Sequence, residues 1–267
     1  MKLVLITGNH PRHFYVAKEL SKSFKETFWI VEKREPFVPK IKKKINYRFK
    51  KLNKLHFEKR EIAENRLFGN YKNFKLKNLK NKILIDRNKF KKQIFSTLKN
   101  AEADILLTYG CSKIPDTVFK NKKIKNYWNI HGGLSPWFKG SITNFWPSYL
   151  LIPQFTGITL HKLSSKIDGG DVLLQTSCKL NPSDGLHDLN CRVIINFCKI
   201  FNKKIKKISL KKNIKGIKQS SNGKIWMKSD WNEKHLVVIY EKFKDRIISF
   251  CIKNDLIKNK PKLIDNL

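Results

Sequence analysis

The chain has 267 residues, 40% of them hydrophobic and 12% aromatic, which suffices for a buried core and argues against global disorder. Its formal net charge of +36 admits nucleic acid as a partner, because basic residues release counterions from phosphate. The five cysteines are odd in number and lack CxxC spacing, so we expect neither disulfides nor a metal site, and a reduced cytoplasmic location.

The positive charge is mostly lysine and is unevenly placed. Only 8 of the 57 basic residues are arginine, although proteins that read phosphates and bases favour the bidentate guanidinium. Residues 40–60 carry ten basic residues and one acid, and residues 199–218 carry nine lysines and no acid. Charges cancel between residues 129 and 190. We interpret the lysine runs, 40–44 and 203–207 included, as solvated faces, and we do not expect nucleic acid as a partner.

No apolar run approaches the about 18 residues that a membrane span needs. The first residues, "MKLVLITGNHPRHF", contain only a short apolar run before a polar turn. That run is too short for a signal peptide and predicts a first β-strand.

Apolar runs and helical stripes alternate along the first half of the chain. The predicted strands span residues 2–7, 27–31, 82–85, 104–110 and 125–131. "DILLTYG" (104–110) is almost continuously apolar and ends in glycine, which is typical of a central parallel strand. The alternation with helices predicts an α/β fold, a Rossmann-like doubly wound, mostly parallel sheet. Residues 36–80 fit either a helix or an ordered insertion.

The second half predicts a helix over "TNFWPSYLL", then strands at 157–163 and 171–177 joined by "SSKIDGG". A long helix should start near Ser183 and carry an apolar stripe as far as Ile208. The last part contains a strand-turn-helix patch. We therefore divide the chain into a catalytic domain, residues 1–208, and a small C-terminal extension, residues 209–267.

The stretch "NIHGGLSPWFKGS" (129–141) places an amide and an imidazole on one face of a strand. Residues i and i+2 of a strand point the same way, so Asn129 and His131 share a face. Open α/β sheets bind ligands beyond the carboxyl ends of their strands, and this strand ends in two glycines that let a substrate approach the backbone. As an alternative, both side chains are satisfied core polars.

The following hairpin adds a carboxylate. Asp168 precedes two glycines, where it can turn inward, although Asp-Gly is also a common turn signal. Asn, His and Asp together suit acyl transfer: Asn129 and a protonated His131 hold the oxyanion, and Asp168 accepts the proton of the attacking amine. No Ser or Cys is placed as a nucleophile, which favours direct attack by a substrate amine.

These elements, in this order, resemble the folate-dependent formyltransferases, and most of all the sugar N-formyltransferases. The family pattern is N-x-H, a Pro-containing loop ending in a basic residue and Gly, a G-x-T-x-H strand, and D-x-G or D-G-G. This chain has Asn129-Ile130-His131, Pro136, Lys139-Gly140, Gly157-Ile158-Thr159-Leu160-His161 and Asp168-Gly169-Gly170. It departs from the family in reading Gly-Leu-Ser-Pro where S-L-L-P is frequent, which affects the expected acceptor contacts.

The resemblance implies formyl transfer from 10-formyltetrahydrofolate, without a metal, with Asn129, His131 and Asp168 as catalytic residues. The folate is expected to contact Ser112, Lys113, Ile114, Ser164, Ser165, Lys166, Ile167 and Asp168. The acceptor is expected to contact Gly8, Asn9, His10, Arg12, Lys139 and His161, with His161 alternatively packing beneath the site. Four aromatic side chains are expected in the core or, alternatively, stacked on a base or sugar: Trp137, Phe138, Phe145 and Trp146.

We expect the acceptor to be a nucleotide-linked 4-amino-4,6-dideoxyhexose and the protein to be a homodimer, as is common in that family. About 50 residues follow Gly216, which we expect to be too few for the C-terminal barrel of a methionyl-tRNA enzyme. Pro11 removes one amide from the phosphate cradle of a glycinamide ribonucleotide enzyme. Methionyl-tRNA and glycinamide ribonucleotide remain alternative acceptors. A basic nucleic-acid-binding module on a degenerate scaffold is the non-enzyme alternative.

Overall fold

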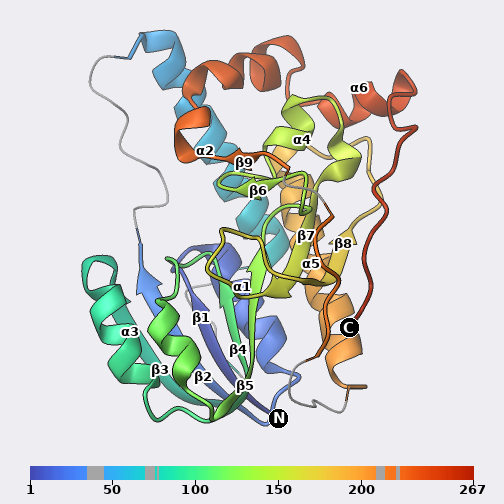
Figure 1. The fold of residues 1–267 in the computed structure, drawn as a ribbon. Helices are drawn as coiled ribbons and strands as arrows, with labels where there is room; N and C mark the ends of the chain where they lie inside the picture. The colour runs from blue at the N-terminus through green and yellow to red at the C-terminus, as the bar shows by residue number, and fades with distance from the viewer. Residues whose placement is uncertain (35–44, 70–75, 77, 209–213, 221–222) are drawn as a thin grey trace.

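A seven-stranded sheet with the order β3-β2-β1-β4-β5-β7-β8 forms the centre of the molecule (Figure 1). The computed structural model describes residues 1–34, 45–69, 76, 78–208, 214–220 and 223–267. The first five strands of this order pair in parallel, and β7 and β8 are antiparallel. The predicted α/β, mostly parallel architecture is confirmed.

The strands of the large sheet are β1 (Lys2–Thr7), β2 (Glu26–Lys33), β3 (Leu79–Asp86), β4 (Ala103–Tyr109), β5 (Ile124–His131), β7 (Gly157–Lys162) and β8 (Val172–Ser177). A second, two-stranded parallel sheet pairs β6 (Lys139–Gly140) with β9 (Ile225–Trp226). The α-helices are α1 (Pro11–Ser21), α2 (Tyr47–Phe68), α3 (Phe90–Leu98), α4 (Trp146–Tyr149), α5 (Leu186–Ile205) and α6 (Ile247–Lys253). Short 3-10 turns lie at Arg87–Lys89, Asp116–Lys120, Pro153–Phe155, Lys228–Asp230 and Glu233–His235, and Val237–Lys242 forms a π-helical turn.

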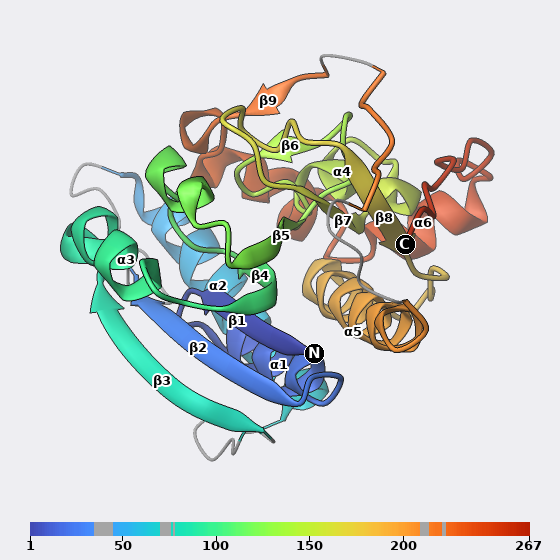
Figure 2. The same cartoon turned by 60° about the horizontal axis from the view of Figure 1, so that its bottom comes forward.

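Helices cover both faces of the central strands β1 and β4, which explains why those two strands are apolar on both sides (Figure 2). Leu3 and Leu5 of β1 join one core cluster with residues of α1 and α5. Val4 and Ile6, on the opposite face, join a second cluster with residues of α3. The alternation along one strand thus divides the core into two layers.

Helix α5 carries the predicted apolar stripe, but its bounds differ from the prediction. It begins at Leu186, because Asn181 starts a turn in which its side chain accepts from the backbone N–H of Ser183 at 3.1 Å. Asp188 then caps the helix by accepting from the backbone N–H of Gly185 at 3.0 Å. The helix ends at Ile205, so Ile208 lies beyond it.

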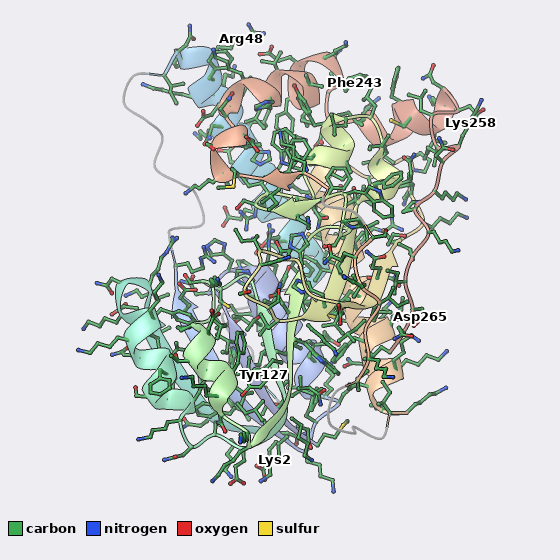
Figure 3. All side chains as sticks on the ribbon, viewed as in Figure 1. Lys2, Arg48, Tyr127, Phe243, Lys258 and Asp265 are labelled. Atoms are coloured by element: carbon green, nitrogen blue, oxygen red, sulfur yellow. The ribbon has the colours of Figure 1, made fainter. Side chains whose placement is uncertain are left out.

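The ambiguous region 36–80 contains the helix α2, which packs against α5 and the C-terminal residues. Arg48 forms an ion pair with Glu241, and Figure 3 shows Arg48 near Phe243, at the end of the molecule opposite Lys2. The lysine run 40–44 lies outside the described residues. The predicted helix over "TNFWPSYLL" is shorter than expected, because only the four residues of α4 are helical.

The C-terminal residues pack directly on the large sheet and on the segment that follows β5. Ile217 forms a bridge to Val172 of β8, and Asp265 forms another to Leu174. Leu236 and Ile239 are buried in a third core cluster that also contains Phe138, Trp146 and Leu186. Among the residues with described positions, no helix is long and apolar enough to span a bilayer.

Core packing of α5 gives the first testable prediction. Phe197 is 1% exposed and stacks on Phe201, with ring centroids 5.8 Å apart. Replacing it with alanine leaves a cavity and should lower the free energy of unfolding by about 3–5 kcal/mol, measured by urea denaturation. Lys199→Ala, an exposed position on the same helix, should change it by less than about 0.5 kcal/mol. A Phe197→Ala protein as stable as Lys199→Ala would contradict this packing.

Candidate active site

The register between β5 and β7 brings two pairs of polar side chains together. Asn129 lies opposite His161, and His131 lies opposite Thr159. Because directly opposed residues of antiparallel strands share a face, Asn129, His131 and His161 meet at the carboxyl end of β5. All of them are buried or half-buried.

Asp168 reaches this face from the loop between β7 and β8. Its Oδ2 lies 3.2 Å from His131 Nδ1 and accepts from the backbone N–H of Gly140 at 2.9 Å. Its Oδ1 lies 3.3 Å from Asn129 Nδ2 and 3.4 Å from His161 Nε2. Two of the side chains predicted to be catalytic, Asn129 and His131, therefore converge on the carboxylate of the third, Asp168. His161 also lies against this carboxylate.

The amide of Asn129 is held in one orientation from both ends. The hydroxyl of Thr108 donates to Asn129 Oδ1 at 2.6 Å. Asn129 Nδ2 lies 3.0 Å from His161 Nε2, while His161 Nδ1 lies 2.7 Å from the carbonyl of Lys162. If Nδ1 carries the proton for that carbonyl, Nε2 is free to accept from the amide, so the Asn129 N–H groups face the site.

Thr108 was not among the predicted site residues. It lies in β4, in register with Asn129 on the neighbouring strand, and is 1% exposed. The available signal was a hydroxyl within the otherwise apolar run "DILLTYG".

The ring of His131 lies between two oxygen acceptors. Its Nε2 is 2.6 Å from the carbonyl of Phe138, and its Nδ1 faces Asp168. Burial lowers the pKa of His131 below its usual 6.5, and the charge of Asp168 and the Phe138 carbonyl offset this only in part. Burial therefore disfavours the protonated form of His131 in the substrate-free protein.

Asp168 is the anionic partner of this pair. Burial by itself would raise its pKa, but His131, His161 and the amide of Gly140 outweigh burial and lower the pKa to about 2. A neutral His131 ring leaves one of its two oxygen neighbours facing a nitrogen lone pair. A second proton on the ring would satisfy both oxygens, so the His131–Asp168 pair can take up a proton.

The two segments predicted to bind folate lie side by side. Lys113, after β4, donates from Nζ to the carbonyl of Ser165 in the 164–168 loop at 2.8 Å. Ser112 donates to the carboxylate of Glu32 from its backbone N–H at 2.6 Å and from its hydroxyl at 2.5 Å. Ile114 is buried in the core. Glu32, which is fully buried at the end of β2, was not among the predicted residues.

The loop after β1 gathers arginines from three distant parts of the chain. Arg12 and Arg60 both pair with Glu64, whose side chain is 1% exposed. Arg34 donates to the carbonyl of Gly110 at 2.9 Å, and its backbone N–H donates to the side chain of Asn9 at 3.1 Å. Two guanidinium groups on one carboxylate, with a third on the Gly110 carbonyl, leave this region positive, and only Arg12 was predicted.

The other predicted acceptor residues lie in two places. Gly8 and His10 belong to the same loop, and the ring of His10 stacks on His13 with centroids 5.4 Å apart. Lys139 is 7% exposed and lies in β6, next to the Gly140 amide that donates to Asp168. Within the described ranges, no group of three His, Cys, Asp or Glu side chains is arranged to hold a metal ion.

Comparison with known sequences identifies relatives of this chain. The family model described as "Formyl transferase" matches residues 51–201. The methionyl-tRNA formyltransferase of Prochlorococcus marinus (strain MIT 9215) is 30% identical over 132 residues, which are 48% of this chain and 40% of that protein. The bifunctional polymyxin resistance protein ArnA of Wigglesworthia glossinidia brevipalpis is 31% identical over 119 residues, 43% of this chain and 18% of that protein. The chain thus spans less than half of these relatives' lengths.

Solved structures with the same fold include three formyltransferases. A 4-N formyltransferase from Francisella tularensis aligns with a TM-score of 0.53 at 17% identity, covering 86% of this chain and 77% of that one. An N-formyltransferase from Helicobacter canadensis, in complex with folinic acid and dTDP-3-aminofucose, gives 0.55 at 18% identity, covering 87% and 73%. Phosphoribosylglycinamide formyltransferase from Anaplasma phagocytophilum gives 0.54 at 16% identity, covering 85% and 98%.

The contact between Asp168 and His131 gives the second prediction. In Asp168→Asn the charge that raises the His131 pKa is lost while the shape is kept, so the pKa of His131 should fall below its wild-type value. NMR titration of the His131 ring in the substrate-free protein measures this. Asp171→Asn, three residues further along the same loop, is the control and should leave the His131 titration unchanged. An unchanged titration in Asp168→Asn would show that the Asp168 charge does not influence the pKa of His131.

Proposed function

The chain belongs to the formyl transferase family, and we propose that it moves a formyl group from 10-formyltetrahydrofolate to the amino group of a nucleotide-linked 4-amino-4,6-dideoxyhexose. The main observation in support of this reaction is that Asn129 and His131 lie 3.3 and 3.2 Å from the carboxylate of Asp168. An oriented amide beside a proton-accepting pair is what direct amine attack on a formyl carbon requires.

Asn129 is proposed to stabilise the charge that develops on the formyl oxygen. Thr108 fixes Asn129 Oδ1, so the amide N–H groups remain for His161, Asp168 or an incoming oxyanion. The contact of Asn129 with Asp168, at 3.3 Å, is the longer of its two donor contacts and is the one an oxyanion would replace at least cost.

The His131–Asp168 pair is proposed to take up the proton of the attacking amine. As the new C–N bond forms, the amine nitrogen becomes positive and must lose a proton. The anionic Asp168 attracts that nitrogen, and the neutral His131 ring can hold the proton between two acceptor oxygens. Return of the proton to the departing folate nitrogen, as its bond to the formyl carbon breaks, completes the transfer and leaves tetrahydrofolate.

A nucleotide sugar is supported as the acceptor by two features of the surface near the site. Trp137, next to the catalytic loop, is 41% exposed, whereas Phe138, Phe145 and Trp146 are buried, so one aromatic face remains for a base or sugar ring. The arginines near Gly8 suit a diphosphate. The formyltransferase from Helicobacter canadensis, which has the same fold, binds folinic acid and dTDP-3-aminofucose.

Methionyl-tRNA is the second candidate acceptor. The curated relatives at 30% identity include methionyl-tRNA formyltransferases, and the net charge of +36 suits a polyanion. This candidate requires the basic faces to contact RNA, so formylation would weaken steeply as the salt concentration rises.

Replacement of Asn129 tests the proposed chemistry. Asn129→Ala should lower turnover by about 10²–10³, because one oxyanion donor is lost. Asn126→Ala is a matched control on the same strand, since Asn126 donates to the carbonyl of Asp104 at 3.2 Å, away from the site. Steady-state kinetics on both variants measures the effect. Near-wild-type turnover in Asn129→Ala would remove it from the mechanism.

A panel of acceptors tests the proposed substrate. With 10-formyltetrahydrofolate we expect turnover on dTDP-4-amino-4,6-dideoxyglucose or GDP-perosamine, and none on glycinamide ribonucleotide or methionyl-tRNA. Turnover on dTDP-3-aminofucose alone would support a nucleotide sugar as the acceptor, but with a 3-amino instead of a 4-amino group. Turnover on methionyl-tRNA alone, with steep salt dependence, would establish the second candidate. RNA binding without any formylation would favour a basic binding module.

A further inference from the structure

The loop that carries Asp168 needs support from outside itself. Asp168 has a positive φ of 44°, which a residue with a side chain rarely adopts. Two glycines follow it and lend the loop freedom rather than stiffness. Yet the carboxylate must stay within hydrogen-bonding distance of three side chains, and small displacements of reacting groups are costly in rate.

Gln219 supplies this support from the C-terminal part of the chain. Its Nε2 donates to the carbonyl of Asp168 and to the carbonyl of Gly170, both at 2.8 Å. The amide therefore uses both hydrogens on the two carbonyls that flank Gly169. Its Oε1 is buried and, among the residues that the structure describes, has no hydrogen-bond partner. The opposite orientation of the amide would point an oxygen at two carbonyls, so the contact fixes the side chain in one orientation.

The segment around Gln219 is anchored on both sides. Upstream, Ile217 exchanges two backbone hydrogen bonds with Val172 of β8, both 2.8 Å long. Downstream, β9 pairs with β6, and Ser141 donates its backbone N–H to the carbonyl of Trp226 at 2.7 Å. These anchors place Gln219 against the Asp168 loop without depending on the loop itself.

The same segment also holds the other partner of the carboxylate. Gly140 donates to Asp168 Oδ2 and lies in β6, paired with Trp226. Gly140 has a φ of 98°, and a Cβ there would lie 2.3 Å from the carbonyl of Trp226, so only glycine allows this close pairing. Gln219 therefore touches the loop that carries the carboxylate, and Trp226 pairs with the loop that donates to it.

We propose that Gln219 is a positioning residue for formyl transfer, holding the Asp168 loop so that the carboxylate faces Asn129 and His131. Its Nε2 binds two backbone carbonyls of the loop, so we expect it to act through Asp168 and not on the substrate. This inference rests on the proposed role of Asp168, and it makes the segment after residue 213 part of the catalytic unit.

Two variants of the same length as glutamine test the proposal. Gln219→Met and Gln219→Glu both lose the N–H donors, and the glutamate also turns an oxygen toward the two carbonyls. We expect kcat to fall about 10- to 100-fold in both, with KM for the folate and for the acceptor within about twofold of wild type. Lys218→Ala, an exposed neighbour on the same segment, is the control and should leave kcat unchanged.

A measurement without substrate separates this inference from the proposed function. In both Gln219 variants the His131 titration should shift in the same direction as in Asp168→Asn, because the carboxylate no longer faces the ring. That shift, with thermal unfolding close to wild type, supports positioning even if the acceptor is different. A wild-type His131 titration would overturn it, whether kcat is retained or falls with general destabilisation.

Discussion

The buried carboxylate of Asp168 is the constraint on which the proposed active site depends. A buried carboxylate loses its hydration and needs polar partners in the protein to offset that loss. Asp168 lies against His131, Asn129, His161 and the backbone amide of Gly140. These partners come from three separate segments of the chain, β5, β6 and β7. The pKa of about 2 reflects how far these partners outweigh burial. Their arrangement can persist only if the strands and loops that present them stay fixed relative to one another.

The antiparallel addition of β7 and β8 to a parallel sheet provides much of that fixation. In a purely parallel sheet the carboxyl end of β5 would meet the carboxyl ends of its neighbours. Here β7 runs back along β5, so Asn129 faces His161 and His131 faces Thr159. The turn to β8 then returns Asp168 to the same face. The hairpin of β7 and β8 therefore adds the imidazole of His161 and the carboxylate of Asp168 to the side chains that β5 presents.

Charge is distributed so that the chemistry is separated from the excess of lysine. Residues 129–190 are neutral overall within a chain of net charge +36. At the start of α1 and on α2, two arginines share the buried Glu64. A buried carboxylate between two guanidinium groups fixes their geometry, and breaking such a pair is costly because it leaves an uncompensated charge. A positive region of fixed shape is thereby kept beside a neutral catalytic centre.

The sequence by itself determined the order of strands and helices along the chain, because buried parallel strands must be continuously apolar and their period is visible in the residues. It also determined that Asn129 and His131 share a face, because strand geometry has a period of two. It did not determine the bounds of α5, since the turn at Asn181 competes with the helix through a side-chain hydrogen bond.

Only the tertiary structure decided what surrounds those side chains. Thr108 and Glu32 reach the site from other strands, and Gln219 reaches it from the C-terminal part of the chain. Such long-range contacts leave no periodic pattern in the sequence. It also decided the direction in which the pKa of His131 is shifted, because burial is a property of the folded chain and not of the residue. Local patterns specify which way a side chain points, whereas long-range packing specifies what it meets.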